Sequence, residues 1–543
     1  MNTPSFSLPT PGSLSCEDEL QHLHDVTRQI DTAIPFLFGQ RAIASSRVNA
    51  LQSSTRHLPA ETLSIIFAHA NDLTRLNPDV KERLRKPHPD HFLLALAGVS
   101  TLWRGIILSN PWLWTYIRLN FNGRAREGCL NLLRLYLTNS GTLKLDVELN
   151  FDAISTRSSS DPMLTPQPWP DRESLIDPSI DSLVIENLHR IRHLHLQTAS
   201  VKWLSCTSEL PNLTYFGFSP NPPSPSTSMY TFLRTNYPLA SFSNSPHLHT
   251  LVLTGPGSYI DLNHGSNWST ITTLELSFLE RSTCVNLLKL CSNVEVFRCR
   301  WHTHHAQPRL QSGPIAPGTP WSSPVIRQSL RILYWDMSQQ TNHWELQMFR
   351  YLHIPAVQKL DLRLWNHSQV PNLREFCSRL SPSITSIHLS MLCPPSQPAS
   401  ECILASFDPQ LQTRELGVRS LNGLHAVDHI LQRMTDPEFL PNVERLRLFG
   451  PFPSPVAVQP SESLVLPKWC TELMLEIIQA RLLSKRVEKF RFEFERLSVT
   501  WTPELRAQLR VLEDQTDGNF DIVQNDSAPG HPYSSLQLWW NSP

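Results

Sequence analysis

The chain has 543 residues, which is enough for several domains or for one long array of repeats. Its 47 basic and 48 acidic residues balance, which argues against a general nucleic-acid binder or a protein of the membrane surface. The 45 prolines and 18 glycines indicate many irregular connectors between short elements, a composition unlike that of a glycine-rich nucleotide-binding enzyme.

The cysteines and the apolar runs indicate the compartment. The 10 cysteines are scattered and form no Cys-x-x-Cys pair, a usage typical of reduced thiols. The longest apolar run, 92–99, is too short to span a bilayer, and the amino terminus lacks the basic and apolar regions of a secretory signal. We therefore expect a protein of the cytoplasm, the nucleus or both, without membrane association.

The first 56 residues divide into two parts. Residues 1–16 are rich in Pro and Ser and are predicted to be disordered, and residues 17–56 are predicted to form a helical, coiled-coil-like segment. Steps of three and four residues separate the positions of a helix seam: Leu20, Leu23, Thr27, Ile30, Ile34, Leu37, Arg41, Ala44, Val48 and Leu51. Pro35 and Gly39 predict two helical pieces rather than one rod. The seam fits either a coiled coil or an amphipathic helix folded against the chain's own body.

The next segment, 57–67, reads His-Leu-Pro-Ala-Glu-Thr-Leu-Ser-Ile-Ile-Phe and predicts a helix. Pro59 suits the first helical position, because a proline there loses no backbone hydrogen bond, and Glu61 complements the helix dipole. The apolar residues fall on one helical face, which comprises Leu63, Ile66, Phe67 and Ala70.

A second amphipathic helix is predicted further along the chain, where apolar residues again recur at steps of three and four. Its face comprises Phe92, Leu96, Val99, Trp103 and Ile106. Asn110 and Pro111 would end this helix. A helical unit this small cannot bury so much apolar surface by itself. We therefore expect it either to bind a partner or to cap the core of the domain that follows.

Two ordered motifs run through residues 57–119: Leu-Pro-x-Glu-x-Leu near the start, and Trp-Arg followed by Pro-x-Leu-Trp near the end. The matching positions are Leu58, Pro59, Glu61, Leu63, Ile66, Phe67, Val99, Trp103, Arg104, Ile107, Pro111, Trp112, Leu113 and Trp114. With these residues the segment resembles the F-box-like domain that is common in mushroom-forming fungi, a family that often carries a predicted coiled coil just before this domain. The resemblance implies a domain that docks a receptor onto the Skp-type adaptor of a cullin–RING ubiquitin ligase. The adaptor-binding residues that it implies are Leu58, Pro59, Glu61, Leu63, Ile66, Phe67, Val99, Trp103, Ile107, Pro111 and Trp114.

After this segment a degenerate Leu-x-x-Leu-x-Leu pattern recurs across residues 130–500. Its instances begin at Ile191, Leu213, Leu248, Ile271, Val294, Leu330, Val357, Ile384, Val443 and Val487. Half of the intervals fall within the period of about 20–29 residues that leucine-rich repeats show. We predict a leucine-rich-repeat solenoid, in which each instance supplies one short strand and a helix or irregular segment returns the chain. The alternative is a non-repetitive α/β domain.

Other segments interrupt or follow this pattern. Residues 155–178, 219–228 and 302–324 are rich in Pro and Ser and are predicted to be loops, and residues 514–543 are predicted to form a disordered tail. The longest interval is predicted to hide a weak repeat at 415–418. The predicted fold class is α/β, with N-terminal helices and an F-box-like helical domain followed by a leucine-rich-repeat solenoid.

No catalytic constellation is found in the sequence, which lacks a Gly-rich phosphate loop, a Gly-x-Ser-x-Gly elbow and a His-Glu-x-x-His pair. His302, His304 and His305 form a metal-like cluster, but no cysteine or carboxylate pair is close to them in the sequence. We expect these histidines to lie in a solvated loop. We therefore predict a subunit that is not an enzyme and has no cofactor and no metal.

In a leucine-rich-repeat strand, the residues between the core leucines face the open side of the solenoid, where a target would bind. The predicted target-binding residues are His195, Lys359, Arg363, Arg445, Arg447, Lys489 and Arg491. Because most of them are basic, the set is predicted to bind an acidic or phosphorylated peptide through charge-assisted hydrogen bonds. The alternative is ordinary solvated charge on the strands.

Two functions fit the sequence. The first is a substrate-recognition subunit of an SCF-type cullin–RING ubiquitin ligase, whose partners are a Skp-type adaptor, a cullin scaffold and an unknown target protein, with no nucleic acid or membrane. Ubiquitin transfer would then follow from holding the target near other subunits, which raises its effective concentration. The second is a leucine-rich-repeat scaffold that assembles proteins without a ligase.

Overall fold

The computed structural model of this chain describes most of residues 15–525. Within that range the description omits residues 53, 77–91, 122–125, 152–177, 221–239, 256–266, 280, 301–323, 337–347, 365–369, 392–410, 421–424, 451–463, 466–467, 485–486, 496, 499–501 and 517. The chain divides into two compact units, one comprising 1–115 with 138–141 and the other 116–137 with 142–543. Tyr116 begins the first strand of the second unit, so the F-box-like range 57–119 extends beyond the helical unit.

The amino-terminal helix α1 (Cys16–Gln52) is one continuous helix of 37 residues, and the prediction of two helical pieces was wrong. The Ser15 hydroxyl begins the helix by accepting a hydrogen bond of 3.3 Å from the Asp18 N–H. Pro35 lies inside the helix. A proline removes one backbone hydrogen bond but leaves those of the neighbouring turns, and the helix continues through it. Of the predicted disordered residues 1–16, those before Ser15 lie outside the described residues.

The other helices of the first unit are short. They are η1 (Ser54–His57), α2 (Ala60–Leu76), α4 (Phe92–Val99), α5 (Thr101–Ser109) and η3 (Pro111–Thr115). The single helix predicted across residues 92–106 is divided at Ser100, which has an extended backbone. The Ser100 hydroxyl caps α5 by accepting a hydrogen bond of 3.1 Å from the Trp103 N–H. The apolar spacing continues across this cap, and spacing alone therefore could not detect the break.

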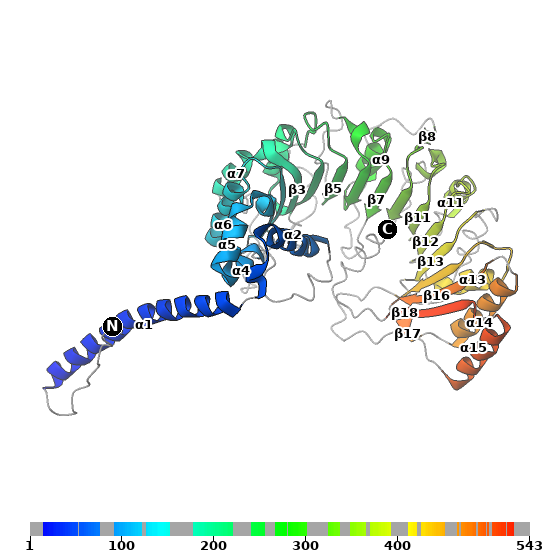
Figure 1. The fold of residues 1–543 in the computed structure, drawn as a ribbon. Coiled ribbons are helices and arrows are strands. Elements are labelled where there is room, and N and C mark those ends of the chain that lie inside the picture. Colours follow the sequence, from blue (N-terminus) through cyan, green and yellow to red (C-terminus); the bar gives the residue numbers. More distant parts are fainter. Residues whose placement is uncertain are drawn as a thin grey trace. The chain divides into compact units, whose positions relative to one another are not determined.

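The second unit is built on one sheet of 14 parallel strands, in which the neighbours follow the order of the chain (Figure 1). The strands are β1 (Tyr116–Asn120), β2 (Leu145–Asn150), β3 (Ile191–Ala199), β4 (Tyr215–Pro220), β5 (Thr250–Thr254), β6 (Thr273–Ser277), β7 (Val296–Arg300), β9 (Ile332–Asp336), β11 (Lys359–Leu364), β12 (Ser386–Met391), β13 (Glu415–Ser420), β14 (Arg445–Phe449), β16 (Phe490–Glu495) and β18 (Phe520–Asn525). Two further pairs of short strands join β8 (Val325–Ile326) to β10 (Leu352–His353) and β15 (Leu464–Val465) to β17 (Leu497–Ser498). The fold class is therefore mixed α/β with a large parallel sheet, as the sequence predicts at this level.

Parallel neighbours require a return segment after each strand, and helices supply many of these returns. The helices are α6 (Arg126–Asn139), α7 (Pro178–Ile185), η6 (Leu188–Arg190), η7 (Val201–Glu209), η8 (Trp268–Thr270), α9 (Arg281–Leu290), α11 (Val370–Cys377), α13 (His425–Met434), α14 (Lys468–Leu483) and α15 (Pro503–Gln515). In Figure 1 the helices α7, α9, α11 and α13 lie along one face of the sheet. The predicted loops 155–178, 219–228 and 302–324 lie almost wholly outside the described residues.

Two rows of buried apolar side chains run across the strands and form the core of the sheet. Cross-strand pairing aligns the first row as Leu194, Phe216, Leu251, Leu274, Phe297, Leu333, Leu360, Ile387, Leu416, Leu446 and Phe492. The second row, two residues further along each strand, comprises Leu196, Phe218, Leu253, Leu276, Cys299, Trp335, Leu362, Leu389, Val418, Leu448 and Phe494. The second and third apolar positions of each predicted instance therefore lie on strands, whereas the first position, except at Ile191, lies just before its strand. The weak repeat predicted at 415–418 lies in β13.

The register of the last predicted instance, which begins at Val487, was wrong. Pairing with β14 continues the two rows through Phe492 and Phe494, whereas the sequence pattern assigned Phe490 and Phe492. All three phenylalanines alternate with polar residues, so the pattern fits two registers equally well. Only the pairing between strands decides between them.

The sheet extends beyond the predicted carboxyl-terminal limit at residue 500. Strand β18 pairs with β16 from Phe520 to Asn525, and the prediction of a disordered tail over residues 514–543 was wrong for this strand. The described side chains of β18, from Phe520 to Val523, are all half-buried, and the polar residues around this short strand obscure it in the sequence. Residues 526–543 lie outside the described residues.

Candidate functional site

The helical unit buries several of the residues that the F-box-like resemblance assigns to the adaptor. Leu63, Phe67, Ile107 and Trp114 are at most 1% exposed. The Trp114 indole N–H donates a hydrogen bond of 2.8 Å to the Ile107 carbonyl. The ring centroids of Phe67 and Trp103 lie 4.8 Å apart. The four residues are therefore buried within the unit, where they support its surface.

Other predicted adaptor residues lie at the surface of the same unit. Leu58, Pro59, Glu61, Ile66, Val99 and Pro111 are exposed. Trp103 is half-buried, and its indole N–H donates a hydrogen bond of 3.3 Å to the Thr55 hydroxyl. The structure thus divides the motif into a buried set and an exposed set, which sequence spacing could not distinguish.

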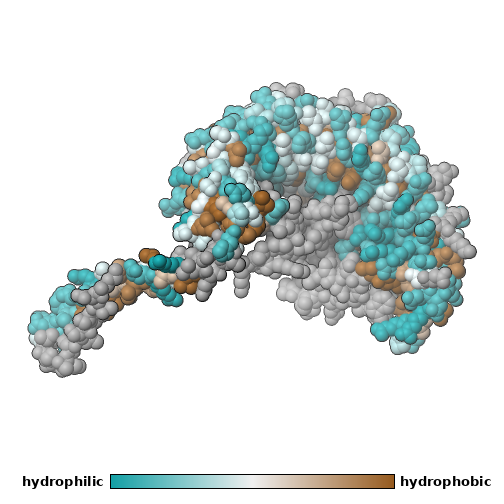
Figure 2. Space-filling model, viewed as in Figure 1, coloured by the Kyte–Doolittle hydropathy of each residue, from teal (hydrophilic) through white to brown (hydrophobic). Residues whose placement is uncertain are grey.

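Sequence reasoning missed additional apolar residues at this surface. After α1, the exposed apolar set of the helical unit comprises Leu58, Ile65, Ile66, Leu94, Val99, Leu102, Leu108 and Trp112. Figure 2 shows hydrophobic side chains gathered over the region of α2, α4 and α5. The available signal was the apolar content of α4, which is apolar on all sides, and of α5, whose apolar residues exceed what one buried stripe requires.

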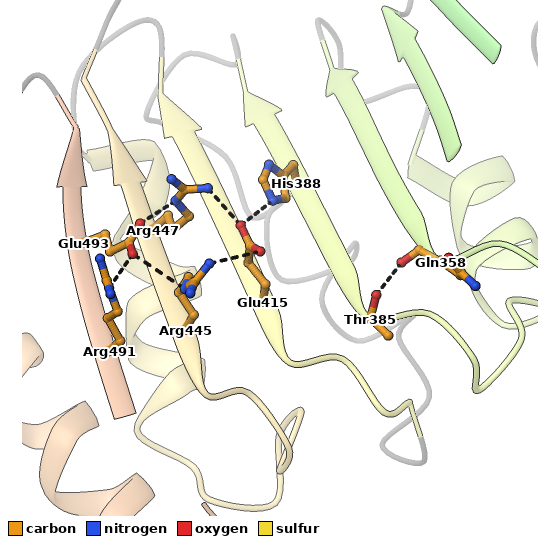
Figure 3. Close-up of polar contacts among 8 residues, drawn as sticks. All are labelled: Gln358, Thr385, His388, Glu415, Arg445, Arg447, Arg491 and Glu493. Atoms are coloured by element: carbon orange, nitrogen blue, oxygen red, sulfur yellow. Dashed lines mark hydrogen bonds and ion pairs between the residues drawn. The ribbon is translucent and has the colours of Figure 1, made fainter. Parts of the chain in front are cut away.

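On the sheet, the residues that alternate with the two buried rows form its polar face. Among the last strands of the sheet, Glu415 of β13 and Glu493 of β16 lie on either side of two arginines of β14 (Figure 3). Arg447 contacts Glu415 at 3.0 Å and Glu493 at 2.6 Å, and Arg445 contacts the same two carboxylates at 3.8 and 3.5 Å. Arg491 contacts Glu493 at 2.5 Å. These three predicted target-binding arginines therefore alternate in space with carboxylates.

The carboxylate of Glu415 is held in its ionised form. Burial raises its pKa, but the hydrogen bonds and charges of His388 and Arg447 outweigh burial and lower the pKa to about 2. The His388 ring nitrogen lies 3.2 Å from the Glu415 carboxylate. This ion-pair network therefore organises the polar face, and Arg445 and Arg447 carry much less free charge than the sequence suggested.

Arg363 and His195 are also occupied within the fold. Arg363 of β11 forms a buried ion pair of 3.3 Å with Asp336 of the neighbouring strand β9. The His195 ring lies against Gly217, where an added Cβ would come within 2.6 Å of the ring. Burial lowers the pKa of His195 to about 4, which leaves the ring neutral at physiological pH. Neither residue is a free positive charge for a target.

A cavity of about 420 Å³ opens at the amino-terminal ends of strands β11 to β18. Five cations and three carboxylates are among its lining residues, which are Lys359, Thr385, Ser386, Arg414, Glu415, Glu444, Arg445, Lys489, Arg491 and Asp521. Lys359 and Lys489 are exposed, and among the described residues neither forms an ion pair. The lining has an excess of two positive charges, so the cavity can attract an anionic group.

The described residues contain no group of three or more His, Cys, Asp or Glu side chains arranged to hold a metal ion. His302, His304 and His305 lie outside the described residues. Among the helices that the structure describes, none has the length and apolar character needed to cross a membrane.

No protein-family model matches the chain, and no curated protein matches it. Two surfaces of the molecule therefore bear on its function: the exposed apolar set of the helical unit and the polar face of the sheet.

Proposed function

We propose that the chain is a substrate receptor of an SCF-type cullin–RING ubiquitin ligase. The helical unit docks the Skp-type adaptor, and the second unit is a leucine-rich-repeat solenoid that binds a target protein. The observation that carries the proposal is the exposed apolar set on the helices that hold the Leu-Pro-x-Glu-x-Leu and Trp-Arg motifs. Eight large apolar side chains on so few short helices are typical of a protein-binding surface.

The arrangement of the sheet supports a repeat array. Parallel strands that follow one another in chain order, each with a return segment, are expected when one supersecondary unit is repeated along the chain. The two aligned rows of apolar residues are the continuous core that such stacking produces. An array of this kind presents a long strand face, which suits recognition of an extended segment.

The adaptor surface is tested with changes to exposed residues of the motif. In the triple variant Leu58→Ala, Pro59→Ala and Ile66→Asp, we expect purified Skp-type adaptor to bind at least about thirtyfold more weakly, since losing one buried anchor costs roughly 2 kcal/mol or more. Affinity is measured by isothermal titration calorimetry on the full chain.

The matched control is Ile185→Asp in α7. Ile185 is 45% exposed and Ile66 is 46% exposed, but Ile185 belongs to the other unit, so adaptor affinity should be unchanged. Circular dichroism checks that all variants keep their helices and sheet. Full adaptor affinity in the triple variant would contradict the docking assignment. A wild-type chain that captures neither adaptor nor cullin from cytosol would favour the scaffold function.

Target recognition is assigned to the cavity at the amino-terminal ends of β11 to β18. Lys359 of β11 and Lys489, which directly precedes β16, both line the cavity and are separated by four strand spacings, or roughly 20 Å. An extended segment spans this distance in about six residues. We therefore propose that the target carries two acidic or phosphorylated groups about six residues apart.

The double variant Lys359→Glu with Lys489→Glu is expected to bind an array of synthetic acidic and phosphorylated peptides at least about tenfold more weakly, because each reversal replaces attraction by repulsion. These lysines are preferable to Arg445 and Arg447, whose reversal would place new carboxylates beside Glu415 and Glu493. Wild-type binding should weaken as salt rises.

The control for charge alone is Arg134→Glu with Lys144→Glu, which changes the net charge equally at exposed positions away from the cavity. Peptide binding should survive in this variant, and adaptor binding should survive in both. Peptide binding that resists both the lysine reversals and salt would show that the cavity carries ordinary solvated charge.

A further inference from the structure

Helix α1 exposes far more apolar surface than an isolated helix in water can sustain. Its large apolar residues with exposed side chains are Leu20, Leu23, Ile30, Ile34, Phe36, Leu37, Phe38, Ile43 and Val48. A helix gains most of its stability from packing an apolar face, and α1 also contains Pro35 and Gly39, which weaken it. Six of these residues lie on the helix seam: Leu20, Leu23, Ile30, Ile34, Leu37 and Val48. Within the described residues they stay exposed, so the seam requires a partner.

The spacing of the seam identifies the kind of partner. Steps of three and four residues run from Leu20 to Val48 without a break, and this is the heptad spacing of a two-helix coiled coil. A seam with a period of 3.5 residues fits a partner helix with the same period. A second copy of α1 has that period.

The charges of α1 decide the orientation. Its first half carries the carboxylates Glu17, Asp18, Glu19, Asp25 and Asp31 against one base, Arg28. Its second half carries Arg41 and Arg47 and no acid. Parallel helices would bring the two acidic halves together, whereas antiparallel helices bring each acidic half beside a basic half.

The antiparallel arrangement also aligns the seam. With Pro35 near the centre, the layers become Leu23 with Val48, Thr27 with Ala44, Ile30 with Arg41, and Ile34 with Leu37 of the second copy. Every seam position then meets a seam position. Arg41 lies next to Asp31 of the second copy, so its aliphatic stem can cover Ile30 while its guanidinium contacts a carboxylate.

We propose that α1 forms an antiparallel coiled coil with α1 of a second copy, and that the full chain is therefore a homodimer. The proposal does not depend on the ligase function. In a dimeric receptor, each target-binding surface would be present twice in one assembly, which raises avidity for a target with two binding segments.

Size-exclusion chromatography of the full chain with light-scattering detection is expected to give twice the monomer mass of 62.0 kDa. The variant Leu23→Asp with Ile34→Asp is expected to be monomeric, because it places charges in two layers of the seam. Its helical circular dichroism should fall, since an unpaired α1 is marginal, while the unfolding midpoint of the sheet should stay unchanged.

The matched control is Phe36→Asp with Ile43→Asp. Both residues are exposed on α1 but lie off the seam, so this variant should remain a dimer. A monomeric wild type, or a seam variant that stays dimeric, would overturn the proposal.

The orientation of the two helices is tested by oxidative cross-linking of introduced cysteines. The wild type is the control for cross-links through the native cysteines. Leu23→Cys with Val48→Cys should give a covalent dimer, because an antiparallel pair brings these positions together. Leu23→Cys alone should not, because its two copies lie at opposite ends of the coil. A covalent dimer of the single variant would show a parallel coil and reject the antiparallel assignment.

Discussion

Replacing Leu251 with Asp is expected to lower the free energy of unfolding of the sheet-bearing unit by several kcal/mol, since it buries an unpaired charge. Leu251 is fully buried and pairs across the sheet with Phe216 on one side and Leu274 on the other. The charge would therefore sit in the middle of a continuous apolar row. Urea unfolding followed by circular dichroism measures the change.

The neighbouring substitution Val252→Asp is the matched comparison. Val252 lies on the polar face and is half-buried, so a carboxylate there can reach water. It would face Glu275 across the strands, and a like-charge pair of this kind costs at most about 1 kcal/mol. Equal damage from the two substitutions would mean that the alternation of buried and polar positions in β5 is wrong.

The second large effect is expected at Arg481 of α14. Its side chain is fully buried, and its guanidinium donates hydrogen bonds to the carbonyls of Met434, Asp436, Phe439 and Leu440. Burial lowers its pKa to about 10, so it stays charged at neutral pH. It thereby supplies donors to the whole turn that follows α13.

Arg481→Met is expected to cost about 3–5 kcal/mol, because several buried carbonyls lose their donor at once. Leu440 has a positive φ of 46°, a conformation that non-glycine residues rarely adopt, and its carbonyl accepts one of these bonds at 3.0 Å. Arg506→Met, at an exposed position of α15, should change stability little. Equal unfolding midpoints for the two variants in urea would show that Arg481 does not hold the turn.

The sequence contained a signal for Arg481 that pattern reading overlooked. Ile477 and Ile478 are fully buried, and Arg481 follows them at steps of four and three, so it lies on the buried face of α14. A charged residue on an apolar face requires partners that compensate it. Its partners are carbonyls more than 40 residues away in the chain, and sequence spacing could not identify them.

For the sheet strands from β3 to β14, the sequence by itself determined where each strand lies and which of its apolar residues are buried. Apolar residues at a period of two place Leu251, Leu253 and their equivalents on one face whatever the neighbouring strands are. In the same way, Pro59 and Glu61 locate the start of α2 to within one residue, since Pro59 directly precedes Ala60. This is possible because helix termini depend on adjacent backbone groups. Such features follow from interactions within a few residues, which a linear pattern records.

Only the tertiary structure decided how the charges pair and which side of each short helix stays exposed. Arg445 and Arg447 looked like free cations in the sequence, but strand pairing places them between Glu415 and Glu493. Trp114 looked like an adaptor anchor, but packing buries it completely. Both outcomes depend on contacts between residues far apart in the chain. Coulomb energy and burial depend on distance in space, and spacing along the chain does not specify that distance.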